Sequence, residues 1–179
     1  MLLENKNAII YGGGGSIGGS VARTFAREGA HVFLAGRTRK PLDVVAADIT
    51  AEGGSAEVAE LDALDEQAVD EHARAVVSRA GSIDVSFNLV TRGDVRGIAL
   101  VDMTTDDLLR AVLNGLRTNF ITARAAARRM IEQGSGVILA LDSGSANGSP
   151  MMGGTGPADA ATDTFIRNLA AEVGPRGVR

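Results

Sequence analysis

Short apolar runs alternate along the chain with longer stretches in which apolar residues recur every three or four positions. The short runs predict buried parallel strands at residues 7–11, 31–35, 56–61, 83–90 and 136–141. The stretches between and after them predict amphipathic helices at residues 17–28, 41–52, 66–80, 106–132 and 157–173. This alternation with short turns predicts an α/β fold in which helices cover both faces of a doubly wound parallel sheet.

Residues with strong positional preferences mark the ends of these helices. We expect Asp65 and Thr105 to cap the helices that follow them, because their side-chain oxygens can accept hydrogen bonds from free backbone amides. Gly29 and Gly81 are placed to end helices, and Pro157 suits the first turn of the last helix. The helix boundaries therefore agree with the apolar periodicity.

Composition narrows the class of protein. The chain has 179 residues, of which 45% are hydrophobic, and this predicts one globular domain over residues 1–179. No apolar run approaches the roughly 18 residues of a membrane span, and the start of the chain does not resemble a signal peptide. Cysteine is absent, the net charge is −4, and neither His31 nor His72 has a second ligand at a useful spacing. We therefore expect a cytoplasmic protein with no metal site, no membrane partner and no nucleic-acid partner.

A glycine-rich loop follows the first predicted strand and opens the first predicted helix. Gly13, Gly15 and Gly18 match the pattern G-x-G-x-x-G. Backbone amides at a helix N-terminus are unpaired and lie at the positive end of the helix dipole, and glycine lets a diphosphate approach them. The alternative is a tight glycine turn without a ligand. The expected phosphate-binding residues are Gly12, Gly13, Gly14, Gly15, Ser16, Ile17 and Gly18.

The end of the second predicted strand bears on the choice between NAD(H) and NADP(H). NAD-binding folds usually place a carboxylate there for the ribose hydroxyls, but residues 35–40 read AGRTRK. Arg37 can pair with a 2′-phosphate, with Thr38 beside it and Arg39 or Lys40 nearby. This favours NADP(H) over NAD(H); the alternative is a solvated, positively charged helix start.

With these motifs, the chain resembles the short-chain dehydrogenase/reductase family, in the branch of the 3-oxoacyl-carrier-protein reductases. The family's T-G-x-x-x-G-x-G loop corresponds to residues 11–18, with Tyr11 in place of the threonine. The resemblance covers essentially the whole chain and implies a three-layer, Rossmann-type sheet. It also implies further nucleotide contacts at Asp62, Ala63, Asn88, Leu89 and Val90, and catalytic roles for Asn119 and Ser143.

The resemblance fails at the active site. In the family a tyrosine follows the serine by about thirteen residues and a lysine follows the tyrosine by four, and counting from Ser143 places Gly156 and Ala160 there. Losing both groups removes acid–base catalysis worth about 10²–10⁴-fold. Nearby carboxyls are Asp142, Asp159 and Asp163, of which the last two more simply suit the first turns of a helix. Ser143 and Ser145 either hydrogen-bond a carbonyl or only populate a polar loop.

The resemblance also bears on length and assembly. Family members continue beyond the fifth helix, so we expect a truncated sheet with its fifth strand at an edge. The long helix and the last helix resemble the pair that forms dimer interfaces in the family. On the long helix, Ala125, Ala126 and Ala127 would allow a partner helix to approach closely. The resemblance therefore implies a homodimer or homotetramer. The alternative for this alanine-rich segment is an ordinary amphipathic helix.

Three functions fit these observations. The first is an NADP(H)-dependent oxidoreductase that moves a hydride between nicotinamide and a small-molecule carbonyl or alcohol. The second is a catalytically deficient NADP(H)-binding sensor or partner subunit. The third is an interaction domain without a cofactor, which the glycine loop and Arg37 disfavour.

Overall fold

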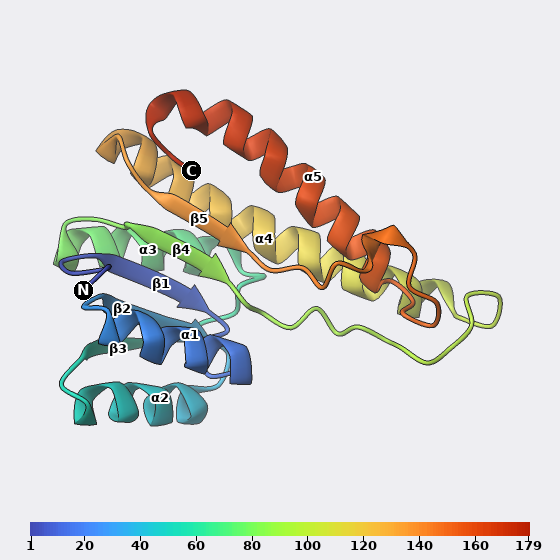
Figure 1. Cartoon of the computed structure of the whole chain (residues 1–179), viewed down its shortest axis with the longest axis horizontal. Helices are drawn as coiled ribbons and strands as arrows, with labels where there is room; N and C mark the ends of the chain where they lie inside the picture. The colour runs from blue at the N-terminus through green and yellow to red at the C-terminus, as the bar shows by residue number, and fades with distance from the viewer.

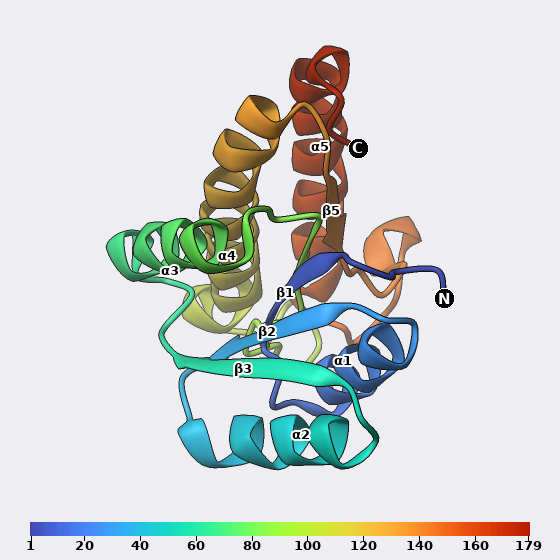
Figure 2. The same ribbon diagram turned by 90° about the vertical axis from the view of Figure 1, so that its left-hand side faces the viewer.

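Five parallel strands form one sheet in the computed structural model, which describes residues 1–179. The strands are β1 (Asn7–Tyr11), β2 (His31–Gly36), β3 (Ser55–Glu60), β4 (Val85–Asn88) and β5 (Val137–Ala140), in the spatial order β3-β2-β1-β4-β5. The helices are α1 (Ser16–Arg27), α2 (Arg39–Ala51), α3 (Glu66–Ala80), α4 (Thr105–Gln133) and α5 (Thr155–Val173). Figures 1 and 2 show the helices on both faces of the sheet, as the alternation predicted.

The central strand β1 separates two apolar cores. Ala8 and Ile10 pack with α1 and α2 on one face, whereas Ile9 and Tyr11 pack with α3 and α4 on the other. Every residue of β1 is buried, which explains why the run NAIIY has no polar alternation. Helix α5 lies alongside α4, and both extend beyond the sheet (Figures 1 and 2).

Several sequence-based boundaries need correction. Thr104, rather than Thr105, caps α4: its Oγ1 accepts a hydrogen bond from the Asp107 amide at 3.1 Å. Helix α5 begins at Thr155, two residues before the expected start at Pro157. The loop before it contains a short 3₁₀ helix at Ser145–Asn147, and the strands β4 and β5 are shorter than the apolar runs that predicted them.

The alanines expected at a subunit interface lie in the interior. Ala125, Ala126 and Ala127 are all buried in the core with Ile9 and Val69. They let α4 approach α3 and the sheet of its own chain closely, so their small size is explained without a partner. The interface argument from these three residues is therefore wrong.

The fifth strand stands at the edge of the sheet, as expected, but its edge is partly paired. The Ile138 amide donates to the Arg179 carbonyl at 2.7 Å, and the Arg179 amide donates to the Gly136 carbonyl at 2.9 Å. Gly136 and Val178 form an isolated parallel bridge. None of the helices has the length and apolarity to cross a bilayer.

Candidate cofactor cleft and active site

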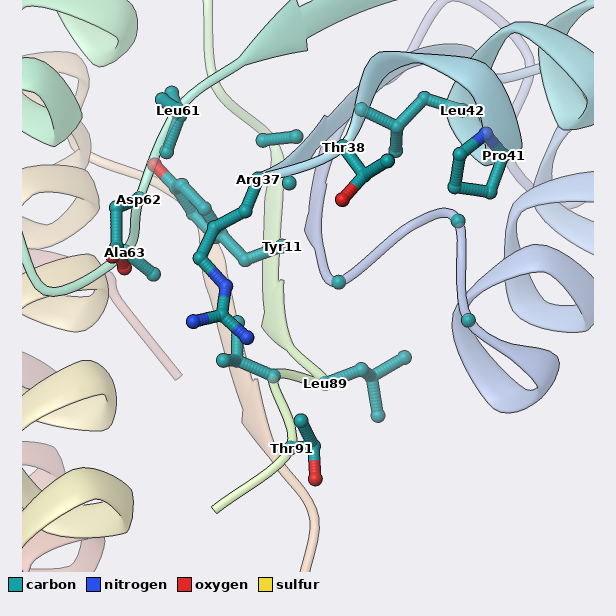
Figure 3. A pocket seen from close by; sticks show the side chains of 16 residues that line it. Tyr11, Arg37, Thr38, Pro41, Leu42, Leu61, Asp62, Ala63, Leu89 and Thr91 are labelled. Atoms are coloured by element: carbon teal, nitrogen blue, oxygen red, sulfur yellow. The ribbon is translucent and has the colours of Figure 1, made fainter. Parts of the chain in front are cut away.

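A cleft of about 280 Å³ opens at the carboxyl ends of the central strands. Tyr11 of β1 pairs with Ala35 of β2 and with Asn88 of β4, so the loops that follow these strands leave the sheet at one level. The strand order reverses around β1, and such a switch point is where ligands bind in open α/β sheets. The lining residues include Gly12, Gly14, Gly15, Arg37, Thr38, Asp62, Ala63, Leu89 and Val90 (Figure 3).

The glycine loop is shaped by close backbone contacts. Gly12 has φ of 77°, and a Cβ there would lie 2.5 Å from the Leu89 carbonyl oxygen. A Cβ on Gly18 would collide with the carbonyl oxygen of Gly12. Both positions therefore exclude any side chain, and the loop stays thin where it borders the cleft.

The N-terminus of α1 is open to a ligand. Four backbone amides there have no hydrogen-bond partner in the chain: those of Gly14, Ser16, Ile17 and Gly18. No side chain caps this helix and no acidic residue lies in its first turn, whereas Asp65 caps α3 and Thr104 caps α4. A bare, positively polarised helix start beside a cleft suits a diphosphate. A tight glycine turn alone would not require four free amides.

Arg37 extends across the cleft toward the segment after β4 (Figure 3). Its guanidinium forms no ion pair within the chain, whereas Arg39 is held by Asp43 at 2.9 Å and so turns to its own helix. Asp62 is the only carboxylate that lines the cleft, and its Oδ1 accepts a hydrogen bond from the Leu64 amide at 3.0 Å. The free cation at the end of β2 therefore suits an additional phosphate on the ribose.

Some cleft residues were not predicted. They are Tyr11, Ala35, Gly36, Pro41, Leu42, Leu61 and Thr91. Tyr11 had a signal, because it departs from the family motif at a position next to the glycine loop. The others are apolar or small residues that give no local signal of their position at the cleft.

Asn119 fixes the segment after β4. Its Oδ1 accepts a hydrogen bond from Asn88 Nδ2 at 3.0 Å, and its own Nδ2 donates to the Gly115 carbonyl at 3.0 Å. Asn88 Oδ1 in turn accepts from the Val90 amide at 3.2 Å. Both asparagines are buried, so their side chains hold the wall of the cleft in place.

Ser143 is bound to a buried carboxylate on α5. Its Oγ donates to Asp159 Oδ2 at 2.7 Å, and the Ser145 amide donates to the same oxygen at 3.0 Å. Because the single hydroxyl proton of Ser143 goes to Asp159, Ser145 must be the donor in the 2.9 Å hydrogen bond between the two serine hydroxyls. The proton of Ser143 is therefore donated to Asp159, and the proton of Ser145 is donated to Ser143.

Asp159 is the centre of an ionic network that sequence spacing did not reveal. Arg92 Nη1 donates to Asp159 Oδ1 at 2.7 Å, and Arg92 Nη2 donates to Asp94 at 3.1 Å. Asp159 is 1% exposed, so the interpretation of this residue as a favourable charge at a helix start is wrong. Burial raises its pKa, but the hydrogen bonds from Arg92, Ser143 and Ser145 outweigh burial and hold the pKa below its usual value. Asp159 is therefore ionised at neutral pH and is a poor proton donor.

The positions expected for the tyrosine and lysine line a different cavity. Gly156 and Ala160 border a groove of about 720 Å³ together with Ser145. Thr155 and Asp159, one residue earlier and also four apart, carry the buried polar side chains, and Thr155 Oγ1 donates to Asp94 at 2.9 Å. Neither pair supplies a phenol or an ammonium group.

The other carboxyls considered from the sequence do not enter this network. Asp142 is exposed and accepts a hydrogen bond from the Gly144 amide at 2.8 Å, as a turn residue does. Asp163 pairs with Arg167 one helical turn away at 2.8 Å.

Comparison with known proteins places this geometry in context. A family profile described as enoyl-(acyl carrier protein) reductase matches residues 13–179. L-rhamnose 1-dehydrogenase (NAD(P)(+)) of Azotobacter vinelandii is 34% identical, over 100% of this chain and 72% of that protein. The 7alpha-hydroxysteroid dehydrogenase of Escherichia coli strain K12 is 31% identical, over 99% of this chain and 69% of that protein.

The solved structures that superpose on this chain are also of oxidoreductases. NAD⁺-bound xylitol dehydrogenase superposes with a TM-score of 0.94 at 27% identity, over 100% of this chain and 69% of that one. A metagenomic short-chain oxidoreductase in complex with NADP superposes with a TM-score of 0.90 at 26% identity, over 100% of this chain and 81% of that one. Similar structures thus include both an NAD⁺ complex and an NADP complex.

Proposed function

Because this chain belongs to the short-chain dehydrogenase/reductase family, we propose that it is an NADP(H)-dependent oxidoreductase that moves a hydride between nicotinamide and a small carbonyl or alcohol. One observation carries the proposal: four unpaired amides stand at the start of α1, where Gly14 lines the cleft, and the unpaired guanidinium of Arg37 lines the same cleft. The amides would hold the diphosphate, and Arg37, beside Thr38, would hold the 2′-phosphate. Asp62 and Ala63 would border the adenine, and Leu89 and Val90 would border the remainder of the dinucleotide.

The bound nicotinamide supplies or accepts the hydride. The protein's own contribution is to hold the substrate oxygen. Of the two hydrogen-bonded serines, only Ser145 lines the groove. Its proton is donated to Ser143, so a free lone pair of its oxygen can accept a hydrogen bond from a substrate alcohol. Asp159 keeps the two hydroxyls oriented in this way. This arrangement favours an alcohol over a ketone as the group that binds Ser145.

Turnover is expected to be slow. Neither serine contacts a phenol, an ammonium or an imidazole group, and the only titratable side chain in contact with them is the ionised Asp159. Positioned acid–base catalysis is worth about 10²–10⁴-fold, so kcat should lie lower by about that factor than in a relative with the full set of groups.

Calorimetric titration with NADPH and NADH, followed by a carbonyl and alcohol screen on the same sample, tests the proposal. We expect Arg37→Ala to weaken NADPH binding by at least tenfold and NADH binding by less than threefold, because a charge-assisted hydrogen bond contributes about 1.5–3 kcal/mol. The matched control is Arg39→Ala, since Arg39 pairs with Asp43 instead. Binding without turnover would select the sensor or partner-subunit function, and absence of binding would refute both.

We also propose that the protein forms a homodimer or homotetramer through α4 and α5. Phe120 on α4 is 43% exposed and lies edge-on to Phe165 of α5, with ring centroids 5.9 Å apart. Leu113, two turns earlier on α4, is 55% exposed. Exposed aromatic and aliphatic side chains on adjacent helices suit a subunit contact. Leu113→Arg should produce monomers in sedimentation velocity; a wild-type protein that is already monomeric would refute the proposal.

A further inference from the structure

The side chain of Tyr11 forms a buried wall of the cofactor cleft. It is 1% exposed, and its ring lies edge-on to His72, with centroids 6.2 Å apart and planes at 77°. Figure 3 shows the ring reaching from the end of β1 toward Leu61 and Asp62, with the hydroxyl at the far end. The packing of the ring against His72 thus fixes the position of the hydroxyl.

Tyr11 lines the cleft, and its hydroxyl makes no hydrogen bond within the chain. Burial raises the pKa of this phenol, and the Asp70 carboxylate raises it further, so the group is a neutral donor over the whole physiological range. Because Tyr11 lines the cleft, a ligand there that accepts the proton of this free donor would gain a hydrogen bond.

The cleft residues toward which the Tyr11 ring reaches indicate the acceptor. Asp62 presents a carboxylate, of which one oxygen is held by the Leu64 amide, and Leu61 and Ala63 contribute apolar surface. A carboxylate accepts from an amine, and the phenol donates to an unprotonated nitrogen. A flat base that carries an amine next to an unprotonated ring nitrogen matches both groups.

We infer that Tyr11 donates a hydrogen bond to the adenine of the bound dinucleotide, at the ring nitrogen next to the amine, and with Asp62 selects adenine over hypoxanthine. Hypoxanthine has a carbonyl in place of the amine and a protonated nitrogen beside it, so it would lose both contacts. The inference rests on the proposed nucleotide binding, and it assigns to Tyr11 a specificity role that a threonine at this position is too short to fill.

Calorimetry on the whole chain tests this role with three ligands: 2′-phospho-ADP-ribose, its hypoxanthine counterpart and nicotinamide mononucleotide. Tyr11→Phe removes only the hydroxyl and keeps the ring against His72. We expect it to weaken the adenine ligand by about 3- to 10-fold and to change the other two by less than twofold. The matched control is Ile9→Val, a change in the same strand and core that does not touch the cleft, which should leave all three affinities unchanged.

Fluorescence provides an independent measurement on the wild-type protein. Tyr11 is the only tyrosine and the chain has no tryptophan, so its emission reports this side chain alone. The adenine ligand should change the emission, after correction against free tyrosine amide, and nicotinamide mononucleotide should not. This measurement remains decisive even if Tyr11→Phe fails to fold.

The outcomes separate this inference from the proposed function. Equal affinity of wild type and Tyr11→Phe for the adenine ligand, or unchanged emission at calorimetric saturation, overturns the role of Tyr11 alone. A wild-type protein that binds neither dinucleotide overturns the proposed function as well.

Discussion

Replacing Asp159 by asparagine tests the buried ionic network directly. The carboxylate is 1% exposed and accepts hydrogen bonds from Arg92, from the hydroxyl and amide of Ser143, and from the amide of Ser145. Removing one partner of a buried ion pair costs about 3–5 kcal/mol, because the other charge stays buried and uncompensated. Arg92 keeps its contact with Asp94 at 3.1 Å, so we expect the lower end, about 3 kcal/mol.

Thermal unfolding measures this loss. In a chain of this size, 1 kcal/mol corresponds to about 2–4 °C, so Asp159→Asn should lower Tm by about 6–12 °C. The matched control is Asp163→Asn on the same helix, where an exposed pair with Arg167 contributes less than about 1 kcal/mol. A double variant, Arg92→Met with Asp159→Leu, should recover much of the loss because it removes both charges together.

Acid unfolding provides the second readout. The folded-state pKa of Asp159 lies below its unfolded value of about 3.8, so its stabilisation is complete above that pH. The stabilisation disappears as the pH falls through the lower, folded-state pKa. Asp159→Asn should therefore flatten the stability profile in this acid range. If Tm falls no further than in Asp163→Asn, the carboxylate does not organise the site and the reasoning is refuted.

Two further predictions concern the nucleotide loop and the core behind it. Gly12→Ala should weaken NADPH binding more than 100-fold in calorimetry, because the methyl group meets the Leu89 carbonyl and φ is 77°; an affinity within threefold of wild type would contradict this. His72 has its pKa lowered from 6.5 to about 4, mainly by burial and then by Arg79. Stability should thus fall by up to about 3 kcal/mol from pH 6.5 to pH 4, and a His72→Phe variant that shows the same fall in urea titrations would exclude this cause.

Local sequence signals were sufficient for the sheet and for the phosphate end of the cleft. The run NAIIY followed by four glycines identifies a buried strand, a turn and a helix start within one short segment. Arg37 could be placed because it lies one residue beyond the end of β2, next to a strand that had already been predicted. Such features depend on residues that are close together in the chain.

The active-site network could not be predicted, because it is formed by pairs of residues that are distant in sequence. Arg92 and Asp159 are separated by 67 residues, and neither lies in a motif that indicates its partner. The prediction of the α4 cap was wrong by one residue because Thr104 and Thr105 are both competent cap residues, and it is Thr104 that accepts a hydrogen bond from the Asp107 amide. The preference for NADP(H) also remains a proposal, since similar structures hold either nucleotide.

Arg92 lies between residues that line the two cavities. The residue follows Thr91, which lines the cleft, and it holds Asp159, which orients Ser145 at the wall of the groove. We expect a molecule that draws Ser145 away from Asp159 to alter the contacts of Arg92 and, through the adjacent Thr91, the position of the cleft wall. Thermodynamic reciprocity then requires that filling either cavity alters the affinity of the other by the same factor.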